Sequence, residues 1–584
     1  MAGVCERMMP EPAQPAAPLL RGARDAVELL LEPSSAPALE LDDALEMVGY
    51  GRFQRRLLLL TGATQCADAM ELLLITFLPR QVRCTTDWGH SLDDSSLSTA
   101  VFCGMLLGAL GAGVVADRWG RRAAFIGTTA LSGIGGLLAA AATASWQIVA
   151  LRFITGAGVG GSPAALALYA EFLPKERRGA ALIGFLLMFS VGAILEAALA
   201  WAVLPTAWGW RGLLVLSALP SLALLACSLC PRSARCWRRG RRGSSGGPEP
   251  HLVPESPRFL LLQGREEEAR ALLECAYDVN HAAKAAALGA AGEGARTFPR
   301  ARLVLVSAAT AQGAAAPSAA KGAPQDDESG DTAVAAAEIF GCCAPLLQRV
   351  LRWLRVGALF APSLRLLSGL LSALFLLMAV VYYCVVLLTP VLVRVAGSTD
   401  DAACAPFSDS DYLGICIANA GELPGLALAA VLLEHPKFGR RRTIVLFFVL
   451  AGLLLLLLAA SVKGFGDSEA LLLMPHASSV LILFLARSAC LGFNQSLWVF
   501  ATERFPTAVR ATGVGATTMF ARFGGIIAAS CVAPLFSESH RAALLTCAAG
   551  CALSAALATR LPPGGGDGVE GGNELADTVV DYDG

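Results

Sequence analysis

Twelve apolar stretches, six before a long polar gap and six after it, restrict the fold of this chain most strongly. A helix that crosses a bilayer needs about 20 predominantly apolar residues. The first six stretches cover 57–79, 97–116, 123–143, 147–172, 180–203 and 211–230; the last six cover 366–392, 413–433, 443–462, 478–500, 511–536 and 541–561. Because backbone polar groups in lipid must be satisfied within the protein, we expect an all-α membrane protein: twelve transmembrane helices in two pseudo-symmetric six-helix bundles.

Composition agrees with this class and argues against several others. The chain is 55% hydrophobic and 16% charged, whereas a soluble protein carries roughly a quarter charged residues. No strongly basic domain suggests a nucleic-acid partner. The six His are dispersed, and no nucleotide-binding loop follows a strand. We therefore expect no enzyme active site, no metal site and no cofactor.

The distribution of Lys and Arg predicts the orientation in the membrane. Basic residues gather before the first span and after the second, fourth, eighth and tenth spans, as at Arg121, Lys175, Arg440 and Arg504. The alternate loops are acidic or short. Since positive charge favours the cytoplasmic side, we expect both termini and the central loop in the cytoplasm. The membrane would be the plasma membrane or that of an intracellular vesicle.

These predictions divide the chain into five parts. We expect a cytoplasmic N-terminal tail at 1–50, largely disordered, and a first bundle at 51–230. The central loop at 231–361 combines a disordered insert, including 281–335, with short amphipathic helices such as the basic one expected at 345–356. The second bundle covers 362–561, and a disordered cytoplasmic tail follows at 562–584.

A first group of charges lies at the cytoplasmic rim of the spans. The group comprises Asp117, Arg118, Arg121, Glu171, Arg178, Glu255 and Arg258 in the first half, and Arg440, Glu503 and Arg510 in the second. We predict that Glu171 and Glu503 pair with Arg residues of the nearby hairpins and loops. Partly solvated pairs of about 1 kcal/mol would form a gate that breaks when the bundles separate. The alternative is ordinary helix-end ion pairs without a gating role.

A second group of polar residues lies deep within the spans. It comprises Asp68 and Glu71 in the first span, Arg152 in the fourth, Glu196 in the fifth, Glu422 in the eighth, Asn494 in the tenth and Arg522 in the eleventh. Charges at membrane depth face a partner or a wet cavity. Asp68 and Glu71 share one helix face, about 4.5 Å apart along the axis, and either could carry a coupling proton. Glu196 could instead pair with a neighbouring helix for structural reasons.

Several motifs resemble those of the major facilitator superfamily. Gly113-x-x-x-Asp117-Arg-x-Gly120-Arg121-Arg122 is similar to its loop signature, and Pro254-Glu-Ser-Pro-Arg258 resembles a motif of sugar-porter-type members. Two further stretches fit the same group: Arg152 to Gly161 followed by Tyr169 to Pro174, and Glu503 to Arg510 in the second half.

More narrowly, three stretches resemble the synaptic vesicle two-related branch of this superfamily. They are Ala67-Asp68-Ala69-Met70-Glu71, Tyr382-Tyr383 and Glu422-Leu-Pro424-Gly425. The likeness extends to the two tyrosines, which we therefore expect at the central cavity. The resemblance implies a transporter that alternates access around that cavity, without implying one particular ligand.

We therefore predict a monomeric secondary active transporter that moves a small organic solute, with protons as the second partner. Acids outnumber bases in the deep group, which favours an organic cation or zwitterion, although Arg522 could hold a carboxylate. One alternative is a facilitative uniporter of the sugar type. The other is a transport-inactive receptor or trafficking protein.

Two cysteines lie in the acidic outer loops. Cys84 follows the first span and Cys404 follows the seventh. Both would face an oxidising compartment. We hypothesise a disulfide bond between them.

Overall fold

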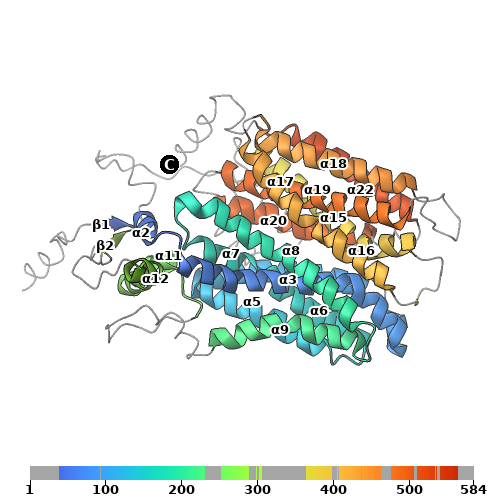
Figure 1. The fold of residues 1–584 in the computed structure, drawn as a ribbon, viewed down its shortest axis with the longest axis horizontal. Helices are drawn as coiled ribbons and strands as arrows, with labels where there is room; N and C mark the ends of the chain where they lie inside the picture. The colour runs from blue at the N-terminus through green and yellow to red at the C-terminus, as the bar shows by residue number, and fades with distance from the viewer. Residues whose placement is uncertain are drawn as a thin grey trace, which may run out of the picture.

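The computed structural model describes most of the chain. The described residues are 38–92, 94–229, 252–287, 298, 302–304, 364–397, 404, 407–435, 437–461, 475–505, 510–532, 535 and 539–562. Within them, twelve helices are long and apolar enough to cross a membrane, in two groups of six (Figure 1). The predicted fold class is therefore confirmed.

The first bundle consists of six spans, one of them in two pieces. They are α3 (Arg52–Thr85), α4 (Asp94–Trp119), α5 (Arg121–Ala139), α6 (Ser145–Gly160) with α7 (Pro163–Ala170), α8 (Arg178–Val203) and α9 (Gly209–Leu229). Gly156 and Gly160 let α6 lie directly against the α4 backbone at Val101 and Met105, where an added methyl group would collide. Small residues at such crossings are how membrane helices approach closely.

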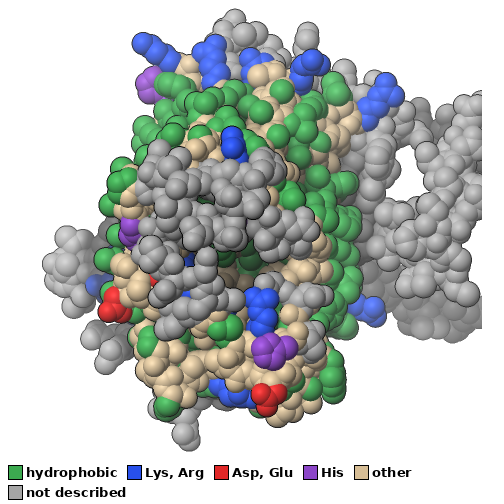
Figure 2. Space-filling view, turned by 90° about the vertical axis from the view of Figure 1, so that its right-hand side faces the viewer, with side chains coloured by type: hydrophobic (Ala, Val, Ile, Leu, Met, Phe, Trp, Pro, Cys, Tyr) green, Lys and Arg blue, Asp and Glu red, His purple; other side chains and the backbone are tan. Residues whose placement is uncertain are grey.

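The second bundle repeats this arrangement. Its spans are α15 (Arg365–Gly397), α16 (Asp409–Ala420) with α17 (Glu422–Glu434), α18 (Gly439–Ser461), α19 (His476–Arg504), α20 (Arg510–Ile527) with η6 (Ala528–Val532), and α22 (His540–Ala558). Large apolar side chains such as Leu107, Trp146 and Leu453 are exposed on both bundles. Seen from the end at the right of Figure 1, hydrophobic side chains cover much of the flanks, as lipid contact requires (Figure 2).

The bundles contact each other through the middle and one end of their helices. Trp201 Nε1 on α8 donates to Asp409 Oδ1 on α16 at 2.9 Å. Thr99 on α4 and Ser530 in η6 share a hydrogen bond of 2.8 Å. These residues lie toward the ends remote from the basic loops. We call that side the outer end, and the side of the basic loops the basic end.

A small folded unit covers the basic end of the first bundle. It contains α2 (Leu41–Val48), α11 (Pro257–Leu262), α12 (Glu266–Ala287) and a parallel pair of strands, β1 (Ala38–Glu40) and β2 (Arg302–Val304), at the left of Figure 1. The Asn280 side chain fastens this unit to α3, because it donates to the carbonyl of Val48 and accepts from the Phe53 N–H at 2.8 Å.

This unit contains residues from two segments that we expected to be largely disordered. Residues 38–48 of the expected N-terminal tail form β1 and α2, and α12 continues through 281–287 of the expected insert. Four of the five apolar residues of α2 form one buried face, but an eight-residue helix is stable only when a partner covers that face. Residues 231–251 at the start of the expected central loop, the expected helix at 345–356 and the tail after 562 lie outside the described residues.

Candidate functional site

A fully buried ion pair lies in the middle of the first bundle. Arg152 Nη2 on α6 donates to Glu71 Oε2 on α3 at 2.8 Å. Glu196 on α8 is also buried, and its Oε2 accepts a 2.7 Å hydrogen bond from Ser217 on α9. Glu196 interacts electrostatically with both Glu71 and Arg152. All three residues belong to the group that we predicted at membrane depth, and all three are buried in the structure.

This cluster has unused hydrogen-bonding capacity and an imbalance of charge. Glu71 Oε1, Glu196 Oε1, and the Nε and Nη1 atoms of Arg152 are buried without a hydrogen-bond partner among the described residues. Two carboxylates face one guanidinium, so the fully ionised cluster would carry one net negative charge. Uptake of one proton would make it neutral, which burial strongly favours.

A second buried ion pair occupies the second bundle. Arg487 Nη2 on α19 donates to Glu422 Oε1 on α17 at 2.6 Å. The Tyr382 hydroxyl on α15 donates to the same oxygen at 3.1 Å. Ser190 on α8 donates to Glu422 Oε2 at 3.1 Å, which joins the two bundles.

Sequence reasoning missed both Arg487 and Ser190. Arg487 could have been found from the internal repeat, because it precedes Glu503 by 16 residues, much as Arg152 precedes Glu171 by 19. A single serine in an apolar span carries no comparable signal.

Asp68 and Arg522 lie on opposite bundles and interact electrostatically. Asp68 lines a cavity together with Thr64, Thr128, Thr129 and other residues of the first bundle. The Arg522 guanidinium lies 3.5 Å from the Tyr383 hydroxyl, and the Tyr383 ring contacts that of Tyr382 with centroids 5.3 Å apart. Asn494 is partly buried on α19.

The deep residues therefore form a belt of neighbouring groups. The belt runs from Glu196, Arg152 and Glu71 through Asp68 and Arg522 to the tyrosines, Glu422 and Arg487. The belt contains predicted residues from both bundles. However, the cavity at Asp68 is lined by none of the other predicted residues.

The predicted rim pairs form within each bundle. Arg121 contacts Asp117 at 2.6 Å and Glu171 at 3.5 Å. Arg440 binds both oxygens of Glu503, at 2.9 and 3.0 Å. Both glutamates thus have the predicted kind of partner, an Arg of the nearby hairpin.

Glu255 is held at the start of α5. Its carboxylate accepts the backbone N–H of Arg121 at 2.8 Å, of Arg122 at 3.2 Å and of Ser256 at 2.9 Å. It packs on Gly120, which has φ of 100° and no room for a side chain. Burial raises the pKa of Glu255 above its ordinary value, and the backbone donors offset part of that rise.

The remaining rim residues have other surroundings. Arg258 lies 3.7 Å from Asp42 on α2, a partner outside the predicted rim group. Arg178 Nη2 donates to the Leu173 carbonyl at 3.2 Å, and the Arg118 guanidinium lies 5.7 Å from the Trp119 ring centroid. Arg510 begins α20, and its side chain is outside the described residues.

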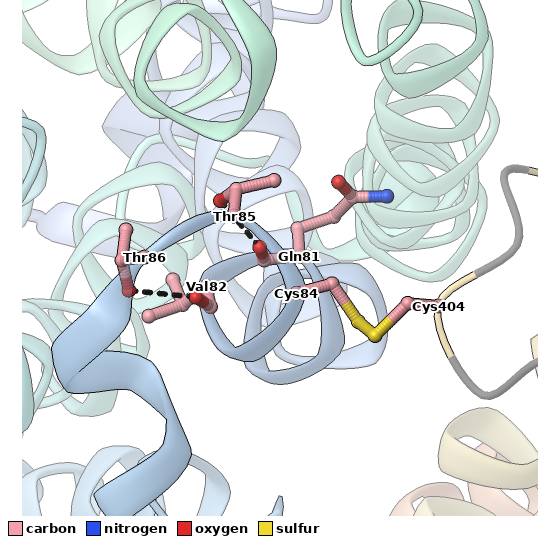
Figure 3. The surroundings of a disulfide bond; sticks show 6 residues. All are labelled: Gln81, Val82, Cys84, Thr85, Thr86 and Cys404. Atoms are coloured by element: carbon pink, nitrogen blue, oxygen red, sulfur yellow. Dashed lines mark hydrogen bonds between the residues drawn. A yellow bond between two sulfur atoms is a disulfide. The ribbon is translucent and has the colours of Figure 1, made fainter.

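Cys84 and Cys404 are joined by a disulfide bond with a Cα–Cα distance of 5.5 Å (Figure 3). Cys84 is in the last turn of α3, and Cys404 lies between α15 and α16. The hypothesised bond is confirmed, and it links the two halves at the outer end.

Comparisons with known proteins agree with this architecture. The sequence model of the Major Facilitator Superfamily matches residues 63–529. The chain is 31% identical to Organic cation/carnitine transporter 7 of Arabidopsis thaliana over 503 residues, covering 83% of this chain and 86% of that protein. It is 28% identical to Synaptic vesicle 2-related protein of Bos taurus over 536 residues, covering 90% and 80%.

Solved structures show the same fold. The xylose transporter XylE from E. coli, in a partially occluded inward open conformation, superimposes with a TM-score of 0.55 at 15% sequence identity, covering 88% of this chain and 100% of that one. The family match extends over most of the chain and agrees with the two six-helix bundles. This multi-pass membrane protein therefore belongs to the Major Facilitator Superfamily.

Proposed function

We propose that this protein is a proton-coupled secondary transporter that moves a small organic cation or zwitterion by alternating access. The observation that carries the proposal is the buried cluster of Glu71, Arg152 and Glu196. Its charge imbalance gives a proton a place to bind at membrane depth, where an unneutralised charge costs several kcal/mol.

The proton would be held on Glu196. Glu71 has a cationic partner at 2.8 Å, whereas the bonded oxygen of Glu196 meets only the neutral hydroxyl of Ser217. When Glu196 releases the proton, its carboxylate competes with Glu71 for Arg152. That competition would weaken the Arg152–Glu71 ion pair between α6 and α3. The packing of these two helices in the first bundle would then depend on whether Glu196 is protonated, which would couple proton binding to the conformational change.

Alternating access would use the contacts between the bundles. Ser190–Glu422, Trp201–Asp409 and Thr99–Ser530 hold the middle and outer end together. This geometry fits a conformation closed on the outer side. In the opposite conformation those contacts would break and the basic end would close. Because Arg121 and Arg440 each pair within one bundle here, they would act as the gate only by exchanging these partners for residues of the other bundle.

The charge of the deep belt supports the substrate class. Four carboxylates, those of Asp68, Glu71, Glu196 and Glu422, accompany three guanidinium groups, those of Arg152, Arg487 and Arg522. Before the proton binds, the one unneutralised negative charge favours a solute with a positive group, and Arg522 beside Tyr383 could hold a carboxylate. The resemblance to a protein named as an organic cation/carnitine transporter points the same way.

The proposed topology places both termini, the central loop and the basic end in the cytoplasm, since positive charge favours that side. The disulfide at the outer end then faces an oxidising compartment. The resemblance to synaptic vesicle 2-related proteins favours a vesicle membrane over the plasma membrane.

Purified protein in liposomes containing a pH-sensitive dye tests the proposal. A panel of organic cations, zwitterions, anions and sugars is added, and internal pH is followed together with uptake. Proton flux that depends on a cation or zwitterion is expected, with loss of coupling in Glu196→Gln. Glu267→Gln, an exposed glutamate on α12, is the matched control.

Two results would contradict the proposal. Uptake without proton movement, unchanged in Glu71→Gln and Glu196→Gln, would establish a uniporter of the sugar type. No uptake of any compound by protein that is folded and correctly inserted would favour a receptor or trafficking protein.

A further inference from the structure

The first bundle also contains a polar cavity, and none of Glu71, Arg152 and Glu196 lines it. Its lining residues are Thr64 and Asp68 on α3, Phe125, Thr128 and Thr129 on α5, Ser162 and Ala165 at the start of α7, and Ser221 on α9. One carboxylate and five hydroxyl groups therefore surround it, and no Lys, Arg or His is among the lining residues. All of these residues belong to one bundle.

The hydroxyl groups present oxygen lone pairs to the cavity. Thr64 donates its hydrogen to the Thr61 carbonyl at 2.6 Å. Thr128 donates to the Ala124 carbonyl at 2.9 Å, and Thr129 donates to the Phe125 carbonyl at 2.7 Å. Because these hydrogens are committed to the helix backbone, the three threonine oxygens can act only as acceptors toward an occupant.

Asp68 has no partner in direct contact. Its side chain is 7% exposed, and it makes no hydrogen bond or ion pair with another described residue. Its electrostatic neighbours are Glu71, one turn along the same helix, and Arg522 on the other bundle. A buried charge of this kind is stabilised by a counter-charge. The cavity walls supply none, because apart from Asp68 their polar groups are neutral hydroxyls.

From this chemistry we infer that the cavity is a binding site for a small monovalent cation, with Na⁺ as the fitting ion. Hard cations prefer oxygen ligands of this kind, carboxylate and hydroxyl rather than nitrogen or sulfur. A single carboxylate neutralises one unit of charge. A divalent ion would leave a net positive charge buried, at a large desolvation cost.

The position of the site gives the ion a structural role. Its ligands come from four segments of the first bundle, so a bound ion would join α3, α5, α7 and α9. It would also neutralise the charge that Asp68 presents to Arg522 across the two bundles. The inference does not depend on the proposed proton coupling, because it concerns separate ligands and a binding event that needs no substrate.

Binding to the purified full-length protein tests the site. Radioactive Na⁺ binding and thermal unfolding are measured at constant pH and ionic strength, with NaCl replaced by LiCl, KCl or choline chloride. Saturable Na⁺ binding and a rise in unfolding temperature that choline does not reproduce are expected. At a Na⁺ concentration 100 times its dissociation constant, nearly all sites are filled.

Substitutions of the cavity-lining residues test whether they bind the Na⁺ ion. Asp68→Asn is expected to abolish Na⁺ binding, and Thr129→Val is expected to weaken it about fivefold through loss of one neutral ligand. Thr61→Val is the matched control, because Thr61 is buried on α3 one turn before Thr64 and does not line the cavity. Thr129→Val keeps the test valid if Asp68→Asn does not fold.

Three outcomes would overturn the inference. They are the absence of saturable Na⁺ binding, Na⁺ stabilisation that persists in Asp68→Asn, and stabilisation by choline or by lowered pH in place of Na⁺. The last would mean that an organic ammonium group or a proton occupies Asp68. The Na⁺-binding test uses no substrate and measures no transport. A failed transport assay would therefore contradict the proposed function without contradicting the Na⁺ site.

Discussion

The Ser190 hydroxyl donates a 3.1 Å hydrogen bond to Glu422 across the boundary between the two bundles. Glu422 also accepts hydrogen bonds from Arg487 and Tyr382 of its own bundle. One carboxylate therefore belongs both to the core of the second bundle and to the contact between bundles. Any rearrangement that separates α8 from α17 must break its bond to Ser190.

Replacing Ser190 with Ala should weaken the contact between bundles without unfolding either one. Loss of one hydrogen bond of about 1 kcal/mol shifts the conformational equilibrium about fivefold away from the state in which the outer ends touch. Hydrogen–deuterium exchange should rise in α8 and α16. Ser228→Ala, a buried serine whose hydroxyl bonds within α9, should leave exchange there unchanged; equal effects of both variants would contradict the prediction.

Removal of the Glu71 carboxylate should destabilise the first bundle strongly. Glu71→Gln removes the partner that Arg152 has at 2.8 Å. Breaking such a pair costs about 3–5 kcal/mol, and an ionised Glu196 would offset part of this cost. The double variant Glu71→Gln/Arg152→Gln should recover part of the loss in unfolding temperature, because no unpaired charge remains. Glu268→Gln, from an exposed pair with Arg265, should change little. A double variant no more stable than Glu71→Gln would contradict this.

Stability should depend on pH through Glu255. Its pKa is raised by burial, so the folded state binds a proton more tightly than the unfolded state. The resulting stabilisation is complete below the ordinary glutamate pKa and is lost as pH rises through the raised value. Between the ordinary glutamate pKa and the raised value, the unfolding temperature of the wild type should fall as pH rises. That of Glu255→Gln should fall less. The same slope in both proteins would show that another group titrates.

The disulfide should stabilise the outer end. Cys84→Ser and Cys404→Ser should each lower the free energy of unfolding by about 2–4 kcal/mol, and the double variant should lose no more than either alone. Cys531→Ser, at an exposed free cysteine, is the control. Peptide mapping without reductant should recover the two cysteines as one linked product; alkylation of both before reduction would disprove the bond.

The main features of the fold could be predicted from the sequence. The length and number of the apolar stretches require twelve spans, and the hairpin around Asp117 and Gly120 predicts where bundle helices turn back. Acidic side chains such as Glu71, Glu196 and Glu422 were identifiable because a charge within an apolar stretch is costly. The folding of residues 38–48 was not predictable, because their short apolar face needs α12 to cover it.

The sequence by itself determined which residues lie at membrane depth and which at the basic end, since hydropathy and charge act locally along each helix. Only the tertiary structure decided their partners: Arg152 for Glu71, Arg487 and Ser190 for Glu422, and a set of hydroxyl groups around Asp68. The physical reason is that a hydrogen bond depends on distances of about 3 Å between helices far apart in the chain. The rotation and crossing of the packed helices fix those distances, and residue spacing in one helix does not encode them.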